Sequence, residues 1–241
     1  MNKKTAIGIF LLALAIAIVV FVLLPQKTEP VVVRPPLETP NQGETEEVYQ
    51  SKIDFEELQK QNSDIYGWLT IPDTKIDYPV LQSAEDDTLY MDHNVNKEED
   101  KNGSLFTEHE FNGNHFSDPV TIIYGHHMKS GAMFGNLQQI YTDEFEDHRD
   151  VVIYTPKKEL HYQVFAAVPY SNRHILYYYD KFRMYEAIEE FLEEILSTRS
   201  IGSTIDQSVT VEKGDRLLVL STCLQGDNTK RFLVIGKLLS E

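Results

Sequence analysis

Cysteine and basic residues are scarce in this chain of 241 residues. Because Cys223 is the only cysteine, no intramolecular disulfide can form, and a small fold held together by disulfide bonds is excluded. Lysine and arginine together number 22, against 38 aspartate and glutamate residues, so the formal net charge is −16. A chain this acidic repels a phosphate backbone, and we therefore expect no nucleic-acid partner.

A metal-binding motif is also missing from the sequence. Several histidines lie between positions 93 and 127, but their spacing matches neither HExxH nor a comparable zinc motif. The acidic run Glu98, Glu99 and Asp100 is typical of a solvated loop, and we do not predict calcium binding there. The sequence therefore predicts a protein that uses neither a metal nor a cofactor.

One long apolar run is present, at residues 5–24, and it contains neither a charge nor a proline. A helix of about 20 residues crosses the bilayer core, whereas the apolar part of a cleaved signal peptide has about 7–15 residues. Lys3 and Lys4 precede the run, so the positive-inside rule predicts a cytoplasmic N-terminus. We therefore expect a single-pass protein of the cell membrane, held by its N-terminal helix, with an extracellular folded domain.

These features divide the chain into four predicted segments. Residues 1–4 are a cytoplasmic N-terminus, 5–24 a transmembrane anchor, 25–45 a proline-rich extracytoplasmic linker and 46–241 the folded domain. The composition, with 41% hydrophobic and 25% charged residues, is that of a globular protein. The length suits one domain of up to about 200 residues with accessory segments.

Short β-branched and aromatic runs dominate the folded domain. They are separated by Gly, Pro, Asn and Asp and lie at 66–71, 75–82, 103–111, 120–126, 151–156, 160–170, 216–223 and 231–239. This spacing predicts a mainly β protein whose strands, about eight in number, form a closed or nearly closed β-barrel.

Two helices are expected beside the strands. The first covers about 45–62, where Asp54 and Glu57 resemble an internal capping pair. The second is a long amphipathic helix within 180–199, before the last strands, with Asp180 as its N-cap. Its glutamates fill the face opposite the apolar stripe, so we interpret them as a solvated face.

Cys223 and Arg231 flank the loop LQGDNTK between the last two predicted strands. If these strands pair as a hairpin, the two side chains face each other across the mouth of the loop. A thiolate can attack a carbonyl, and a guanidinium presents a planar fork of donors to the oxyanion that forms. Taken singly, each residue is more typical of structure, a buried thiol and a surface arginine, but the pair favours a reactive site.

A cysteine nucleophile also needs a proton acceptor, and the sequence contains eight histidines. His126 stands out because the apolar strand IIYGHH ends there and Gly125 permits a tight turn, which places an imidazole at the rim of the barrel. The adjacent His127 remains a rival, since neither periodicity nor spacing excludes it.

Five segments in order are similar to the sortases, and to class B in particular. They are DIYGWLTIPDTKIDYPVLQ (64–82), the stretch from LYMDHN through NGSLFTEH (89–109), TIIYGHHMKSGAMFGNL (121–137), LLVLSTC (217–223) and RFLVIGKLL (231–239). The resemblance covers nearly all of residues 46–240 and implies a sortase-type barrel as the catalytic domain.

The resemblance implies a membrane-anchored cysteine transpeptidase. Its implied site consists of Cys223 as nucleophile, His126 as acid/base, Arg231 as the substrate-aligning and oxyanion-stabilising residue, and Ser221 and Thr222 as residues that seat the sorting-signal peptide. The implied reaction cleaves a Thr-containing sorting signal of exported proteins through a thioacyl-enzyme. An amine of a cell-wall precursor or of a pilin then accepts the acyl group. An extracellular cysteine endopeptidase and a non-catalytic peptide-binding barrel remain as alternatives.

Overall fold

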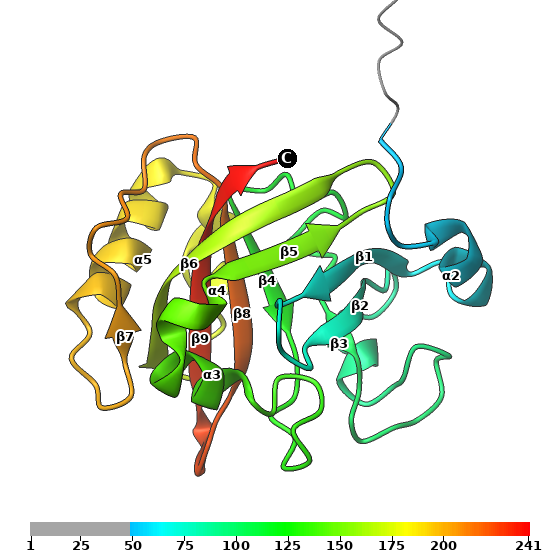
Figure 1. The fold of residues 1–241 in the computed structure, drawn as a ribbon, viewed down its shortest axis with the longest axis horizontal. Helices are drawn as coiled ribbons and strands as arrows, with labels where there is room; N and C mark the ends of the chain where they lie inside the picture. The colour runs from blue at the N-terminus through cyan, green and yellow to red at the C-terminus, as the bar shows by residue number, and fades with distance from the viewer. Residues whose placement is uncertain (1–48) are drawn as a thin grey trace, which may run out of the picture. The chain divides into compact units, whose positions relative to one another are not determined.

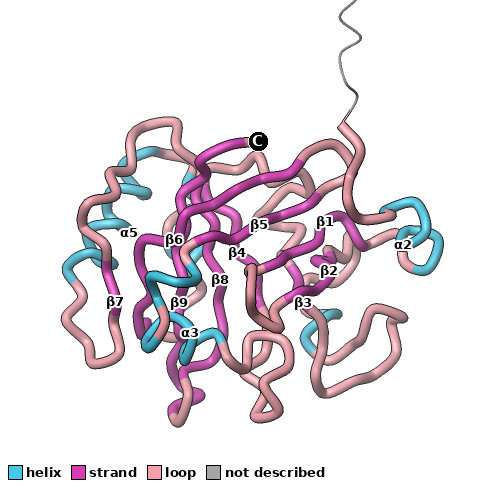
Figure 2. Tube along the Cα trace, viewed as in Figure 1, coloured by secondary structure: helices cyan, strands magenta, loops and turns pink. Residues whose placement is uncertain are grey.

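The computed structural model describes residues 49–241, and nine strands in this part of the chain join in one sheet that curls on itself (Figure 1). The strands are β1 (Ile65–Thr70), β2 (Asp77–Leu81), β3 (Leu105–Phe106), β4 (Val120–Tyr124), β5 (Asp150–Tyr154), β6 (Glu159–Tyr170), β7 (Thr204–Ile205), β8 (Leu217–Leu224) and β9 (Asp227–Ser240). Figure 2 shows the helices at the periphery of these strands.

The sheet closes into a barrel because β5 pairs with β6. The order around the ring is β5, β1, β2, β3, β4, β8, β9, β6, and β7 pairs with β6 outside the ring. Eight strands of the described residues therefore form the closed ring, which confirms the mainly β fold and the predicted barrel. Most neighbours are antiparallel, but β2 and β3 run parallel, as do β4 and β8, and the second of these pairs leads to the site.

Both faces of β8 are buried, which explains why its sequence is a continuous apolar run rather than an alternating one. Leu218 and Leu220 point into the barrel interior. Leu217 and Val219 point outward and pack in a second apolar cluster, which also contains Phe191. We call this second cluster the outer cluster. The outer cluster identifies the external face of β8. Because side chains alternate along a strand, it also fixes the face to which each residue after Val219 points.

The helices of the described residues are short. They are α2 (Phe55–Gln61), α3 (Leu137–Asp143), α4 (Ile175–Tyr178) and α5 (Tyr185–Ser197), with 3₁₀-helices η1 (Leu89–Met91), η2 (Phe145–His148) and η3 (Asp180–Phe182). α5 is the predicted amphipathic helix. Its residues Ile188, Phe191, Leu192 and Ile195 are buried against the outer face of the barrel, and burial of each such side chain stabilises the fold by about 1.5–3 kcal/mol.

One detail predicted for this helix is wrong. The N-cap is Met184 rather than Asp180, because Asp180, Lys181 and Phe182 all have positive φ values and form a separate turn. The glutamates of the helix face solvent as predicted, although Glu194 is only partly exposed and also contacts two tyrosines. Glu194 accepts hydrogen bonds from the hydroxyls of Tyr170 at 3.0 Å and Tyr179 at 2.6 Å.

The N-terminal helix is shorter than predicted. It begins at Phe55, because the Asp54 carboxylate accepts the Glu57 N–H at 3.0 Å and acts as the N-cap itself. Residues 49–54 are not helical, and residues 45–48 lie outside the described part. The capping pair proposed from the sequence therefore exists, but it marks the start of the helix instead of its interior.

The predicted localisation in the cell membrane is contradicted. Among residues 49–241, no helix combines the length and the apolar character needed to cross a bilayer. The longest helix described, α5, has 13 residues, whereas a span requires about 20. The predicted cytoplasmic N-terminus at 1–4, anchor at 5–24 and linker at 25–45 lie outside the described residues.

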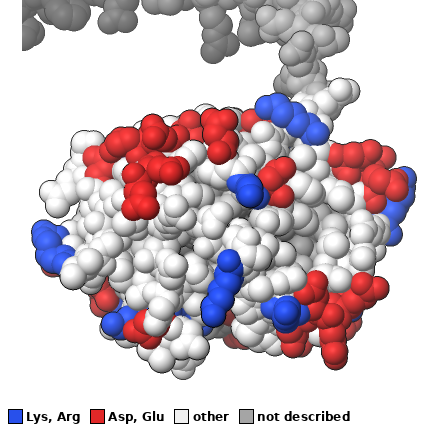
Figure 3. Space-filling model, turned by 60° about the horizontal axis from the view of Figure 1, so that its bottom comes forward, with Lys and Arg blue, Asp and Glu red and all other residues white. Residues whose placement is uncertain are grey.

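Acidic side chains dominate the charged groups on the face drawn in Figure 3. They gather in separate clusters with uncharged surface between them, and basic side chains lie singly among them. With the net charge of −16, this distribution favours the approach of neutral or cationic ligands over anionic ones.

Candidate active site

The hairpin of β8 and β9 brings Cys223 and Arg231 together, as the sequence predicts. The two residues are direct partners in the antiparallel ladder. Arg231 Nη1 donates a hydrogen bond to Cys223 Sγ at 2.9 Å, so the guanidinium reaches the sulfur itself. The contact is only partly buried, which leaves the sulfur open to a ligand.

His126 reaches the same place through the parallel pairing of β4 and β8. In this ladder Tyr124 lies level with Ser221, and the Gly125 N–H donates to the Ser221 carbonyl at 3.1 Å. His126 lies two residues after Tyr124, and Cys223 lies two residues after Ser221. The parallel pairing thus brings the two residues to one end of the barrel, where both line the same cleft.

A backbone contact holds the His126 ring. Its Nε2 lies 2.6 Å from the carbonyl oxygen of Met91, in η1. Because a carbonyl only accepts hydrogen bonds, Nε2 carries the proton in this arrangement, and Nδ1 is the nitrogen that can accept one. The loop that follows β2 thus orients the imidazole on the outer face of the barrel.

His127 is in a different environment. Its backbone forms an isolated bridge with Met133, and its Nδ1 atom is buried without a hydrogen-bond partner among the described residues. Burial lowers the pKa of His127. The cleft around Cys223 includes His126 among its lining residues and does not include His127. The geometry therefore favours His126 over its neighbour as the base.

Gly125 permits the chain to pass close to the barrel wall just before His126. A Cβ atom at this position would lie 2.6 Å from Phe134 Cδ2 and closer still to Leu105 Cδ2. Real Cβ atoms almost never approach other carbon atoms so closely. The glycine is therefore required by close packing and not by a positive φ, which other glycines of the described residues have.

The three predicted residues line one cleft of about 220 Å³. Its walls are formed by Met91, Phe106, Tyr124, Gly125, His126, Ser221, Thr222, Cys223 and Arg231. Ser221 and Thr222 are 3% and 2% exposed. Successive side chains alternate across a strand, so Ser221 shares the outer face with Cys223, while the Thr222 hydroxyl is buried without a hydrogen-bond partner among residues 49–241.

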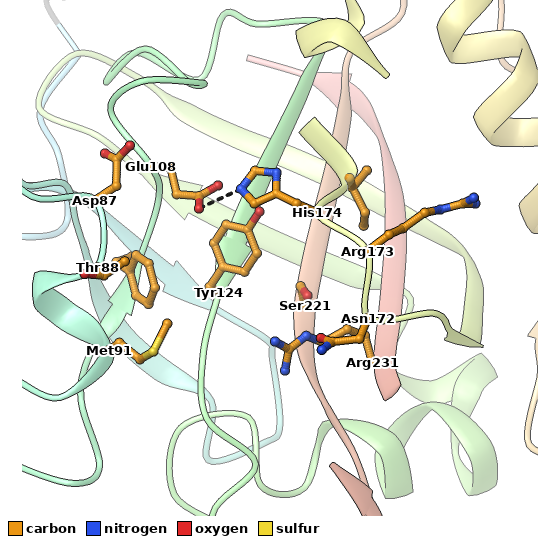
Figure 4. A pocket seen from close by; sticks show the side chains of 12 residues that line it. Asp87, Thr88, Met91, Glu108, Tyr124, Asn172, Arg173, His174, Ser221 and Arg231 are labelled. Atoms are coloured by element: carbon orange, nitrogen blue, oxygen red, sulfur yellow. Dashed lines mark hydrogen bonds and ion pairs between the residues drawn. The ribbon is translucent and has the colours of Figure 1, made fainter. Parts of the chain in front are cut away.

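A second cavity of about 150 Å³ continues the cleft past Arg231 (Figure 4). It shares Met91, Phe106, Tyr124, Ser221 and Arg231 with the first cleft. We call the two together the groove. Glu108 and His174 close the far end, where the His174 ring nitrogen Nε2 lies 2.9 Å from Glu108 Oε1.

These two residues were missed by the sequence reasoning. Glu108 follows β3 and His174 precedes α4, so 66 residues separate them along the chain. Burial raises the pKa of Tyr124, which lies between them and Arg231, and the Glu108 carboxylate raises it further. Tyr124 therefore stays protonated and can act as a hydrogen-bond donor.

No group of three or more His, Cys, Asp or Glu side chains within residues 49–241 is placed to hold a metal ion. The polar groups of the groove are a thiol, two imidazoles, two guanidiniums, hydroxyls, an amide and carboxylates. They suit covalent chemistry by the sulfur, proton transfer by a histidine and charge stabilisation by an arginine.

Comparisons with known proteins agree on one family. A family model described as the Sortase domain matches residues 69–239. Sortase B from Listeria monocytogenes is 36% identical over 191 residues, which cover 78% of this chain and 75% of that protein. A Staphylococcus aureus sortase B–substrate complex is 28% identical, with a TM-score of 0.67 over 79% of this chain and 87% of that chain.

A Streptococcus pyogenes class B sortase involved in pilus biogenesis is 29% identical, with a TM-score of 0.64 over 78% of this chain and 98% of that chain. The likeness thus extends over sequence, fold and nearly the whole described domain. The chain belongs to the sortase family, to class B within it, and is a cysteine transpeptidase of the sortase type.

Proposed function

We propose that this transpeptidase cleaves a Thr-containing sorting signal of exported proteins and transfers the threonine acyl group to an amine of a cell-wall precursor or a pilin. The observation that carries the proposal is the contact of Arg231 Nη1 with Cys223 Sγ, in a cleft that His126 also lines. Residues 46–241 form the catalytic domain in this proposal.

The first half of the reaction forms the thioester. Cys223 passes its proton to His126, the resulting thiolate attacks the threonine carbonyl carbon, and the carbonyl oxygen takes the negative charge. Arg231 donates hydrogen bonds to that oxygen, because its guanidinium already lies at the sulfur and offers several donors in one plane. His126 then gives a proton to the leaving amine as the C–N bond breaks.

The second half transfers the acyl group. The acceptor amine loses a proton to His126 and attacks the thioester carbonyl, and the Cys223 thiolate leaves. Two comparisons support the substrates: one of the similar structures is a sortase B–substrate complex, and another is a sortase involved in pilus biogenesis. Neither decides between a cell-wall precursor and a pilin for this chain.

Ser221 and Thr222 seat the peptide in different ways in this proposal. Ser221 lines both cavities and points to the outer face, so its hydroxyl is available to the peptide. The Thr222 hydroxyl is buried, so this residue contributes its backbone to the cleft.

A thioester trap tests the proposal. The domain 46–241 is incubated with Thr-containing sorting peptides, quenched in acid and examined by mass spectrometry, with Cys223→Ala as the matched control. We expect an acyl adduct on Cys223 in the wild type only. Adding a suitable amine, presented on peptidoglycan-like and lysine-bearing acceptors, should divert product from free acid to amide. Product that stays entirely free acid would indicate an endopeptidase, and an unmodified, unreactive Cys223 would indicate a binding module.

A further inference from the structure

A break in the register of β8 and β9 lies directly before Arg231. Cys223 pairs with Arg231, but the next residue of β8, Leu224, pairs with Asp227. One step along β8 therefore corresponds to four steps along β9, and residues 228–230 have no ladder partner among the described residues. We call these residues the 228–230 bulge. Bulges are frequent next to active sites, where they re-aim a side chain.

Arg231 is the residue of β9 that depends most on this bulge. From Arg231 onward, β9 pairs one to one with β8 as far as Lys237. On the other side of β9, the last residue of β6, Tyr170, also pairs with Arg231. Both ladders end at Arg231 in the same direction, and the ends of ladders fray more readily than their middles. Arg231 is therefore held from one direction by two ladders and from the other by whatever fixes the bulge.

The carboxylate of Asp227 fixes the bulge. Its Oδ1 atom accepts the hydroxyl of Thr229 at 2.5 Å and the backbone N–H of the same residue at 3.1 Å. These two hydrogen bonds lower the pKa of Asp227, so the carboxylate is ionised at neutral pH. Lys230 Nζ lies 3.6 Å from Oδ2, but its side chain is 57% exposed, and such a pair contributes little. The bulge is held mainly through Thr229.

The turn between the two strands is attached separately to the barrel. Gln138 Oε1, in α3, accepts the backbone N–H of Gln225 at 3.0 Å. Leu224 packs against the apolar cluster of the barrel interior. Gly226, with a φ of 83°, lets the chain reverse direction. These contacts do not involve the Asp227 side chain, so we expect the hairpin to remain folded when Asp227 is substituted.

We propose that Asp227 is a positioning residue for the reaction, which holds the 228–230 bulge so that Arg231 keeps its guanidinium at the sulfur of Cys223. The inference rests on the proposed function, because it takes Arg231 as the residue that stabilises the oxyanion. Asp227 is not among the residues that line the groove. It acts on the reaction through Arg231.

Single-turnover acylation of Cys223 by a Thr-containing sorting peptide tests this assignment. Asp227→Leu removes the accepting oxygens at similar size and should slow acylation at least about tenfold, because a displacement of about 1 Å can cost about 10²-fold in rate. Asp227→Asn keeps an oxygen that accepts from Thr229 and should stay within about threefold of the wild type. Asn228→Ala, at an exposed position of the same bulge, is the matched control and should leave the rate unchanged.

A double-mutant cycle separates positioning from general support of the fold. In an Arg231→Ala background, followed over hours by mass spectrometry, Asp227→Leu should slow acylation no further, whereas independent effects would multiply. The NMR signal of the Arg231 side-chain Nε–H gives a second readout without turnover. It should shift or broaden in Asp227→Leu and stay unchanged in Asn228→Ala. If Asp227→Leu does not fold, Thr229→Val, which removes the hydroxyl donor, replaces it in both measurements.

The outcomes distinguish the two proposals. A folded wild type that forms no acyl adduct with any sorting peptide contradicts the proposed function together with this inference. A wild-type rate of acylation in Asp227→Leu, or an unchanged Arg231 signal, overturns the inference alone. Equal losses in the wild-type and Arg231→Ala backgrounds also overturn it, because Asp227 would then support the hairpin as a whole. Asp227→Asn as slow as Asp227→Leu would contradict the contact with Thr229, and with it the assignment.

Discussion

The two ends of the groove are built in different ways. At the thiol end, Cys223 and Arg231 are ladder partners in β8 and β9, and His126 follows β4 after Gly125. At the other end, Glu108 and His174 come from two connections and are joined by one side-chain hydrogen bond. Main-chain ladders thus fix Cys223 and Arg231, while a side-chain contact joins Glu108 and His174.

This difference predicts how each end tolerates change. Ladder hydrogen bonds are shared over many residues, so the thiol end moves only if the barrel itself opens. The connections contain short helices and exposed aromatic residues, such as Tyr177 at 78% exposure, and have fewer ladder bonds to hold them. Substitutions at the thiol end should therefore affect kcat, and those at the other end should affect KM and peptide preference.

The largest effect is expected from the histidine. His126→Ala removes the group that transfers protons to and from nitrogen, and general acid–base catalysis contributes about 10²–10⁴-fold to a rate. His127→Ala is the matched control, and it should lose less than about tenfold because His127 does not line the cleft. Single-turnover acylation of Cys223 measures both. Equal losses of acylation rate in the two variants would contradict the assignment of His126 as the acid/base.

Arg231→Lys should have the next largest effect. The ammonium keeps the charge but loses the planar set of donors that reaches Cys223 Sγ, and removal of one oxyanion donor costs about 10²–10³ in kcat. Lys230→Ala, at the exposed neighbouring position, is the control. A lysine variant within a few-fold of the wild type would show that only positive charge matters at this position.

The thiol end can be predicted from the sequence for the same reason that it is rigid, because both depend on the pairing of strands. The apolar runs of β8 and β9 and the loop between them indicate a hairpin, and the ladder confirms that Cys223 faces Arg231. The end of β4 is visible in the pattern IIYGHH. The contact of His126 with the Met91 carbonyl could not be predicted, because the position of η1 depends on distant packing, including the Ser104 N–H bond to Tyr90.

The other end could not be found from the sequence. Glu108 and His174 carry no motif, and they meet only because α4 packs across the barrel. The same connection contains the error at Asp180, where a turn with positive φ replaces the predicted helix start. β7 was also missed, since two residues are too short to show a period. Local patterns therefore predict the strands, and long-range side-chain contacts are left undetermined.

Gly125→Ala probes how closely the thiol end depends on the barrel wall. The added methyl group would meet Leu105 and Phe134, and overpacking of this kind costs about 1–3 kcal/mol of stability. A shift of His126 by about 1 Å would lower turnover about 10²-fold. Gly113→Ala, where a Cβ meets only Asp118 at 3.7 Å, is the control for both unfolding and turnover. Wild-type turnover in Gly125→Ala would show that the imidazole is less constrained than the ladder implies.

The smallest effect is expected at Glu194, which ties α5 to the connection that carries His174. Its carboxylate accepts hydrogen bonds from Tyr170, Tyr179 and Arg173, and its side chain is 41% exposed. Glu194→Gln keeps the shape but loses the charge, so the free energy of unfolding should fall by roughly 1 kcal/mol, because solvent screens a partly exposed pair. Glu193→Gln, an exposed change on the same helix, is the control.

Peptide kinetics on these two variants sharpen the comparison between the ends. A loosened connection lets α4 and His174 shift while β8 and β9 stay paired, since no ladder bond passes through Glu194. Glu194→Gln should therefore raise KM a few-fold and leave kcat within about twofold of the wild type. Both changes are smaller than a tenfold change, which corresponds to about 1.4 kcal/mol. A fall in kcat with an unchanged KM would mean that the connection supports the thiol end as well, and the two ends would then not be independent.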